Sequence, residues 1–317
     1  MTYSRILLIW MALWSTSVLA QRAIPDNNLA YPVWINLTNC TGNIVSIQGS
    51  GFFLDTGAKL YLVTARHILY TQPQPANPPT PARGPELQCK VAELRSYSKD
   101  PSEVQQNRMI LSLEILASTG KVKPHASHDV AVVELGTTEQ LPAPTATTPS
   151  VPASPPIPGT VSQAGILRYN PGIAGIQNAP SGLLDVSMDT VRKFDQVLTA
   201  NEIYVFGYPA SIGLQQAPQI DYNAPLLRKG IVSGLNSANK TIVLDALTFH
   251  GNSGGPVLEV THEGFVTHFF IIGVVSQYVP VAETWINTAQ GYGNVQIYNS
   301  GYSIAEPMDP VLELIGQ

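Results

Sequence analysis

Charged residues are scarce in this chain of 317 residues: Asp, Glu, Lys and Arg together make up 12%. The net charge of -5 comes from scattered acids, so the sequence indicates no basic surface, and we expect no nucleic-acid partner. Helix-favouring Lys and Glu are few, whereas 25 Gly, 26 Pro and many β-branched residues are present. This composition argues against a mainly helical chain and predicts short strands joined by turns.

Cysteine is almost absent, since Cys40 and Cys89 are the only two. If the protein is exported, they enter an oxidising compartment, and we expect them to form a disulfide around a loop that contains His67. Such a bridge would stabilise the fold by about 3–4 kcal/mol. Two buried free thiols are the alternative. Paired Cys motifs and a His-Glu-x-x-His helix are also missing, so we expect no metal and no cofactor.

One apolar run stands apart at the amino terminus. Arg5 precedes the apolar stretch 6–14, and small residues follow at 17–20. This order is typical of a secretory signal peptide, so we expect residues 1–20 to be removed and the mature chain to begin near Gln21. An uncleaved membrane anchor is the alternative, but the run is shorter than the ~20 residues that span a bilayer. We expect a secreted or periplasmic protein with no membrane contact after signal removal.

Short apolar runs separated by glycines form two sets of predicted strands. The first set comprises residues 33–37, 44–47, 52–54, 60–63, 90–94, 109–116 and 130–135, and the second comprises residues 202–207, 230–235, 241–244, 255–260, 265–276 and 301–305. Each set is sufficient for one β-barrel. Asp309 before Pro310 predicts a short terminal helix over residues 310–315.

The segments between these runs are rich in proline. Residues 72–85 contain six prolines and predict an exposed loop, and residues 141–158 contain seven and predict a linker. Residues 166–169 are compatible with a strand and residues 188–198 with a short helix. We therefore divide the chain into an amino-terminal barrel (21–140), a linker and interdomain segment (141–200), and a carboxy-terminal barrel with its helix (201–317).

One glycine-rich segment, Gly-Asn-Ser-Gly-Gly-Pro at 251–256, holds a single hydroxyl at Ser253. Acyl transfer by a serine needs a base within hydrogen-bond reach and a third group that orients the base. His67 follows an apolar strand and Asp129 opens another, so both can supply these roles. The amides of Gly251 and Ser253 could point together at a developing oxyanion. Each residue alone has a structural alternative: a glycine-rich turn, a satisfied histidine, and an aspartate that caps its own turn.

Together these motifs match a known pattern. The segments Gly-Ser-Gly-Phe-Phe-Leu at 49–54, Thr-Ala-Arg-His at 64–67, His-Asp-Val-Ala-Val at 128–132 and the serine segment resemble the trypsin-like peptidases. The resemblance is strongest to the bacterial exported type, which includes glutamyl endopeptidases and high-temperature-requirement proteases, and it extends over nearly all of residues 44–315.

The resemblance implies an all-β fold of two antiparallel six-stranded β-barrels, with the active site at their interface and a short C-terminal helix. His67 and Asp129 would come from the first barrel and Ser253 from the second. It implies a secreted serine endopeptidase that cleaves peptide bonds through an acyl-enzyme, with Gly251 and Ser253 forming the oxyanion hole. Asn252 stands where enzymes activated by a newly cut amino terminus have an aspartate, so that activation is not expected.

The resemblance also implies a set of substrate-binding residues: Leu247, Thr248, His250, Ser276, Gln277 and Tyr278. Leu247 falls where trypsin has an aspartate for basic side chains, and Val275 falls where glutamyl endopeptidases have a histidine. Cleavage after a basic or an acidic residue is therefore disfavoured, and an apolar or small side chain is expected. For His250, an exposed turn histidine is the alternative to a role at the rim of the site.

We expect a protein or peptide substrate and a monomeric enzyme whose activity rises as His67 becomes neutral. The main alternative is a catalytically silent module with the protease fold, which binds peptides in the same groove without turnover. A non-proteolytic exported β-barrel protein with a fortuitous match is a second alternative.

Overall fold

The structure is a computed structural model that describes residues 24–71, 85–140, 165–210, 216–221, 223–264 and 266–317. Three sequence predictions lie outside the described residues: the signal peptide (1–20), all but the last residue of the proline-rich loop (72–85), and the linker (141–158).

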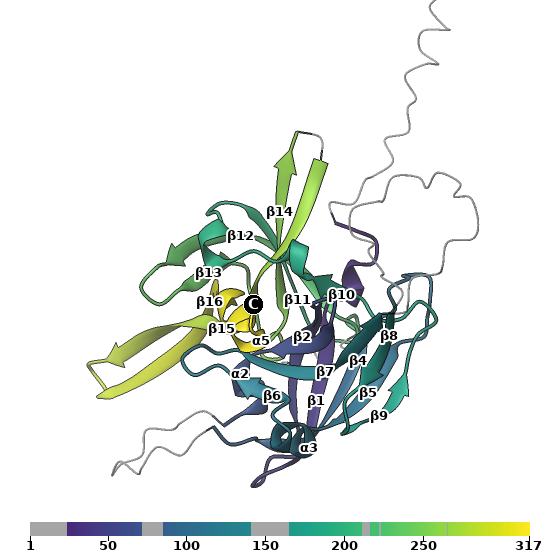
Figure 1. The fold of residues 1–317 in the computed structure, drawn as a ribbon. Helices are drawn as coiled ribbons and strands as arrows, with labels where there is room; N and C mark the ends of the chain where they lie inside the picture. Colours follow the sequence, from purple (N-terminus) through teal and green to yellow (C-terminus); the bar gives the residue numbers. More distant parts are fainter. Residues whose placement is uncertain (1–23, 72–84, 141–164, 211–215, 222, 265) are drawn as a thin grey trace, which may run out of the picture.

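Strands dominate the described residues and form two systems that follow one another along the chain (Figure 1). The first system contains β1 (Val33–Cys40), β2 (Ile47–Asp55), β3 (Lys59–Thr64), β4 (Cys89–Ser96), β5 (Asn107–Ser112), β6 (Val122–Pro124), β7 (Ala131–Gln140), β8 (Gly165–Tyr169), β9 (Ile173–Gln177) and β10 (Asp185–Ser187). The second contains β11 (Glu202–Gly207), β12 (Leu226–Asn236), β13 (Thr241–Asp245), β14 (Pro256–Glu263), β15 (Val266–Asn287) and β16 (Tyr292–Pro307).

Helical segments in the described residues are short. The α-helices are α2 (Arg66–Leu69), α3 (Leu113–Ser118) and α5 (Asp309–Ile315), and the 3-10 turns are η1 (Asn28–Ala30), η2 (Met188–Thr190) and η3 (Phe194–Gln196). The all-β class with a short carboxy-terminal helix is therefore confirmed.

The second system closes into a barrel with the strand order β11-β12-β13-β16-β15-β14, as predicted. The first system is a ten-stranded sheet with the order β6-β7-β3-β2-β1-β4-β5-β9, to which β8 adds through β7 and β10 through β2. It has ten strands instead of the six expected: residues 33–140 already form seven, β1 to β7, and β8, β9 and β10 from the segment 141–200 join them.

Three local predictions of secondary structure differ from the fold. The predicted run 44–47 is not a strand of its own, because residues 44–46 precede β2, which begins at Ile47 and also contains the predicted run 52–54. We predicted a strand over 109–116, but β5 ends at Ser112, and α3 follows because Leu113 and Leu116, one helical turn apart, are both buried. The segment 188–198, which the sequence left compatible with a short helix, contains the separate turns η2 and η3.

A core of apolar side chains lies between the two systems, and we call it the intersystem core. Along β2, β3 and β7 the side chains alternate between the inside of the first sheet and this intersystem core, as the period of two in a strand requires. Phe52 and Val63 face the intersystem core, where they meet Phe206 and Val274 from the barrel. A separate cluster fills the barrel itself. Because the strands are buried on both faces, the two systems are fixed against each other.

The terminal helix α5 closes the intersystem core, to which Met308 and Val311 contribute. Met308, rather than the predicted Asp309, is the residue before the first helical turn, and Pro310 lies inside that turn. The carboxylate of Asp309 instead accepts a hydrogen bond of 2.7 Å from the amide of Phe194.

Cys40 and Cys89 form the predicted disulfide. They lie opposite each other on the paired strands β1 and β4, so the bridge fastens two neighbouring strands. Such a bond points to an oxidising compartment. None of the helices in the described ranges is long and apolar enough to cross a membrane.

The strands β15 and β16 extend far beyond the predicted runs 265–276 and 301–305. Residues 278–287 of β15 pair with residues 292–303 of β16 and project from the barrel as a two-stranded hairpin (Figure 1, yellow-green). We call residues 278–299 of this hairpin the arm.

Candidate active site

His67 and Asp129 meet where β3 and β7 end at the same edge of the first sheet. His67 lies in the single turn α2 that follows β3, and Asp129 lies two residues before β7, whose first residue Ala131 pairs with Thr64. The amide of His67 donates to Asp129 Oδ1 at 2.9 Å, and Nδ1 of its ring lies 2.6 Å from Asp129 Oδ2. An ionised carboxylate accepts the Nδ1 proton, which leaves Nε2 free to accept another.

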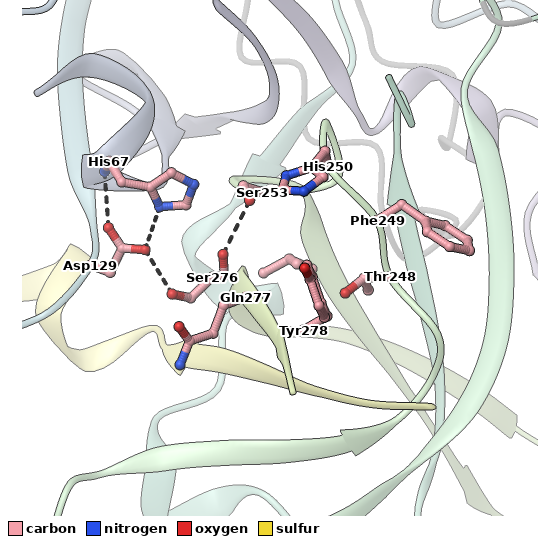
Figure 2. A pocket seen from close by; sticks show the side chains of 10 residues that line it. His67, Asp129, Thr248, Phe249, His250, Ser253, Ser276, Gln277 and Tyr278 are labelled. Carbon is pink, nitrogen blue, oxygen red and sulfur yellow. Dashed lines mark hydrogen bonds and ion pairs between the residues drawn. The ribbon is translucent and has the colours of Figure 1, made fainter. Parts of the chain in front are cut away.

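A third hydrogen bond reaches this carboxylate from the barrel. Ser276 Oγ donates to Asp129 Oδ2 at 2.7 Å (Figure 2). Burial opposes ionisation of Asp129, but the hydrogen bond and charge of His67 and the hydroxyl of Ser276 outweigh it and hold the pKa of Asp129 below its ordinary value. Asp129 therefore remains an anion that can orient and stabilise a protonated imidazole.

Ser253 lies in a tight loop between β13 and β14, which we call the nucleophile loop (residues 249–255). Gly251 has φ +91° and Gly254 has φ +88°, both in the region that favours glycine. A Cβ atom on Gly254 would also lie 2.0 Å from the carbonyl oxygen of Ser50 in β2. The glycines in the sequence motif are therefore required by backbone conformation and by close contact with the first sheet.

Hydrogen bonds to two backbone carbonyl groups orient the amides of this loop. The carbonyl of His250 accepts from the amide of Ala210 at 2.8 Å, and the carbonyl of Asn252 accepts from the amide of Gly255 at 2.9 Å. Because the C=O and N–H of one trans peptide point in opposite directions, these bonds turn the amides of Gly251 and Ser253 away from the two donors. Within the described residues neither amide donates a hydrogen bond to the protein. Both are thus available to an anion.

The hydroxyl of Ser253 donates to the carbonyl oxygen of Ser276 at 3.1 Å, and within the described residues it makes no hydrogen bond with the His67 ring (Figure 2). Both side chains line one cavity of 210 Å³ between the two strand systems. The cavity residues are His67, Asp129, Thr248, Phe249, His250, Ser253, Val275, Ser276, Gln277 and Tyr278. The structure therefore brings the three residues of the predicted triad to one cavity.

Five of the six predicted substrate-binding residues also line this cavity. The exception is Leu247, which is half-buried and does not contribute to it. Phe249 lines the cavity but was not predicted. The exposed ring of His250 packs edge-on against Tyr278, with ring centroids 5.7 Å apart. His250 therefore lies at the rim.

The hydroxyl of Thr248 can only accept hydrogen bonds from a ligand in the cavity. Ser303 Oγ uses its proton on the carbonyl of Ala246 at 2.7 Å, so Thr248 Oγ1 must donate to Ser303 Oγ, which lies 2.7 Å away. This part of the cavity offers no hydroxyl donor to a carboxylate.

Ser50 was not singled out from the sequence, although it stands between two glycines in the quoted motif. It is fully buried in β2 and makes three hydrogen bonds to the barrel. Its amide donates to the carbonyl of Ser253 at 2.9 Å, its hydroxyl donates to the carbonyl of Gly251 at 2.6 Å, and the amide of Tyr208 donates to that hydroxyl at 2.9 Å. Ser50 thus holds the nucleophile loop against the first sheet.

Of the remaining histidines, His125, His128 and His268 form ion-pair contacts with glutamates away from the cavity, and His262 contacts the hydroxyl of Thr267 instead. His125 Nε2 lies 3.1 Å from Glu313, and His128 Nδ1 lies 2.7 Å from Glu306. In the part of the chain that the structure describes, no three His, Cys, Asp or Glu residues are arranged to hold a metal ion.

Solved structures similar to this chain include the HtrA-type protease AlgW with tripeptide, with 14% sequence identity and a TM-score of 0.44. A serine-to-alanine variant of AlgW with tripeptide follows, with 14% identity and a TM-score of 0.43. These matches cover 92% and 90% of this chain, and it spans 63% and 60% of theirs. A comparison with curated proteins gives no match.

The sequence profile of the trypsin-like peptidase domain matches residues 49–266, which is well over half of the chain. The matched range includes His67, Asp129 and Ser253, and it extends across both strand systems. This chain therefore belongs to the trypsin-like peptidase family.

Proposed function

We propose that this protein is a serine endopeptidase in which Ser253 is the nucleophile, His67 the general base and Asp129 the group that orients the base. The observation that carries the proposal is the convergence of these three side chains on one cavity, with Asp129 bonded to the ring Nδ1 of His67. The amides of Gly251 and Ser253, which donate no hydrogen bond within the described residues, would supply the charge stabilisation that acyl transfer needs.

The reaction begins with a peptide extended across the cavity. Ser253 Oγ leaves the carbonyl of Ser276, gives its proton to His67 Nε2 and attacks the carbonyl carbon of the peptide bond. The amides of Gly251 and Ser253 donate to the oxyanion. His67 then returns the proton to the leaving amine, which yields an acyl-enzyme, and a water activated by the same ring hydrolyses the ester.

The cavity supports cleavage after an apolar or small side chain. Thr248 offers no donor to an acidic side chain, because its proton is used on Ser303. The other cavity residues are neutral side chains, apart from His67, Asp129 and the rim residue His250. A basic or acidic side chain would lose its hydration there without a matched partner in the described residues.

The disulfide supports action outside the cytoplasm, so we propose secretion or export to the periplasm. The chain needs no cofactor for this chemistry, and we propose that it acts as a monomer on protein or peptide substrates.

A second function is favoured by one observation. Ser253 Oγ is bonded to the carbonyl of Ser276 rather than to the imidazole, which is compatible with a silent module that binds peptides in the same groove. Incubation of the wild type and of Ser253→Ala with a peptide library, read by mass spectrometry, separates the two functions. The endopeptidase produces new termini that the variant does not produce. A silent module leaves the library uncut by both proteins.

A further inference from the structure

The arm takes no part in the reaction proposed above. It is apolar and exposed: relative exposure is 63% for Trp285, 72% for Ile286 and 68% for Ile297. Further large side chains at least 43% exposed are Val281, Tyr292, Val295 and Tyr298. The register of the two strands divides these side chains between the two faces of the arm: one carries Val281, Trp285, Tyr292 and Tyr298, and the other carries Ile286, Val295 and Ile297. Monomeric proteins rarely leave such apolar clusters exposed without a partner.

One edge of β15 is open along the arm. Pairing with β14 stops at Val274, and from there to Asn287 the described residues provide no strand beside β15 except β16 on its other edge. The open edge begins at the nucleophile, because the carbonyl of Ser276 on this side accepts the hydroxyl of Ser253. The edge thus leads from the candidate active site into the arm, with register shifts between Val275 and Gln277 and between Tyr278 and Pro280, and with no N–H at Pro280.

A second cavity connects the active site with the arm. Its volume is 150 Å³, and its lining is Phe249, His250, Tyr278, Ile297, Tyr298 and Asn299. The first three also line the active-site cavity, and the last three belong to β16 of the arm. An occupant of the active site that continues outward therefore meets apolar side chains of the arm.

We propose, on the basis of the proposed function, that the arm binds the part of a polypeptide substrate that precedes the cleaved bond. The preferred substrates are extended, uncharged, apolar segments that add as a third strand to the open edge of β15. Among the residues of β15 in the arm, Trp285 on one face and Ile286 on the other are the largest exposed apolar neighbours of such a strand.

The direction of the substrate follows from strand geometry. Residue numbers along β15 increase away from Ser253, and antiparallel pairing is the more stable arrangement of two strands. An antiparallel substrate therefore approaches Ser253 as its own numbering increases, and its amino-terminal side lies on the arm. From Ser276 to Asn287 the edge is about 35 Å long at ~3.4 Å per residue, enough for about ten substrate residues.

The near absence of charge on the arm indicates the class of substrate. Between residues 278 and 302 the only charged residue is Glu283. A charged substrate side chain would lose hydration against this surface without an opposite charge to pair with. A hairpin of two strands is only marginally stable in water, so a third strand also stabilises the arm. Unfolded or extended apolar segments fit these conditions better than folded, charged surfaces.

The test uses one cleavable core peptide taken from the library experiment. The core is extended on its amino-terminal side by eight residues that alternate either Val and Thr or Glu and Ser. Binding of each labelled peptide to Ser253→Ala is measured by fluorescence anisotropy, and kcat/KM is measured with active enzyme. We expect the Val-Thr extension to improve both binding and kcat/KM by at least about tenfold, and the Glu-Ser extension to give no gain.

Two kinds of arm variant are compared. In one, residues 282–297 are replaced by Asn-Gly, which makes a short hairpin between Val281 and Tyr298. In the other, Ile286→Thr and Ile297→Thr remove apolar surface while keeping β-branched side chains, so the arm still pairs. Both should abolish the gain from the Val-Thr extension. Val104→Thr is the matched control, because Val104 is 96% exposed and outside the arm, and it should keep the gain.

The possible results distinguish a failure of the arm proposal from a failure of the proposed function. Peptide that binds through the arm but is never cut by the wild type refutes the proposed function and leaves the arm as a peptide-binding surface. An equal gain in the wild type and the arm variants overturns the arm proposal and leaves the peptidase intact. If sedimentation shows a dimer that the arm variants dissociate while peptide binding is unchanged, the arm is a contact between copies and the proposal is wrong.

Discussion

The nucleophile loop and the arm belong to the same barrel but are held in different ways. In the loop, the carbonyls of His250, Gly251, Asn252 and Ser253 are all fixed by hydrogen bonds, two of them from Ser50 in the first sheet. In the arm, backbone pairing connects β15 and β16 with each other and with nothing else in the described residues. A catalysed reaction requires that the reacting groups are already held in position, whereas a surface that binds peptides of different sequence can adapt its conformation.

The largest expected effect concerns the loop. Ser253→Ala removes the nucleophile, and we expect kcat to fall by about 10⁶-fold because the remaining groups cannot form an acyl-enzyme. Steady-state hydrolysis of the library-derived peptide measures the loss, with thermal unfolding as the control that the variant is folded. A decrease below tenfold would contradict the assignment of the nucleophile.

Asp129→Asn tests the support of the base. The amide cannot hold the imidazole in the same tautomer, so we expect kcat to fall by about 10⁴-fold while peptide binding changes little. Comparison of kcat with the peptide affinity of the double variant that also carries Ser253→Ala separates the two effects. Loss of affinity with an unchanged kcat would show that Asp129 acts on binding instead.

Ser50→Ala tests whether the loop is positioned by the first sheet. The change leaves the buried carbonyl of Gly251 and the amide of Tyr208 without their hydroxyl partner, which costs about 1–3 kcal/mol of unfolding free energy. We also expect kcat to fall about tenfold to a hundredfold, because the neighbouring amides move. Ser118→Ala, on the exposed end of α3, is the control and should leave both quantities unchanged. Destabilisation with an unchanged kcat would limit Ser50 to a structural role.

The pH dependence of stability tests the electrostatics of Asp129. Its pKa is lower in the folded state than in the unfolded state, so its stabilising effect is complete above the unfolded value near ~4 and is lost as pH falls through the folded value. We expect the free energy of unfolding of the wild type to fall more steeply than that of Asp129→Asn between about pH 5 and about pH 2. Urea unfolding at several pH values measures the slopes. Parallel curves would contradict the lowered pKa.

The smallest effect belongs to the arm. Ile286→Thr changes a side chain that is 72% exposed, so we expect the free energy of unfolding to change by less than about 0.5 kcal/mol. Chemical denaturation measures this change. A loss above about 2 kcal/mol would show that the arm is packed and stable, and would remove the difference between the arm and the loop.

The sequence predicted the regions where one physical pattern dominates. The buried strands alternate or are continuously apolar, and the glycines of the serine motif are needed for positive φ and close approach, so β3, β7 and the nucleophile loop were predicted from residues alone. The disulfide followed from the presence of only two cysteines.

The arm could not be predicted in the same way. Asn, Gly and Gln interrupt its apolar residues, and neither face is buried, so no alternation of apolar and polar side chains marks it as a strand. Its two strands depend on each other and on the turn at residues 288–291, where Asn287 accepts hydrogen bonds from the amides of Ala289 and Gln290. The role of Ser50 was hidden for another reason, because its partners lie 158 and 201 residues away in the chain.

Labelling with a fluorophosphonate, followed by peptide mapping by mass spectrometry, tests directly whether Ser253 is the nucleophile. We expect one phosphonyl group per wild-type chain, located on the peptide that contains Ser253, and no label on Ser253→Ala or on denatured protein. A folded wild type that takes up no label, or that is labelled at another residue, would contradict that role.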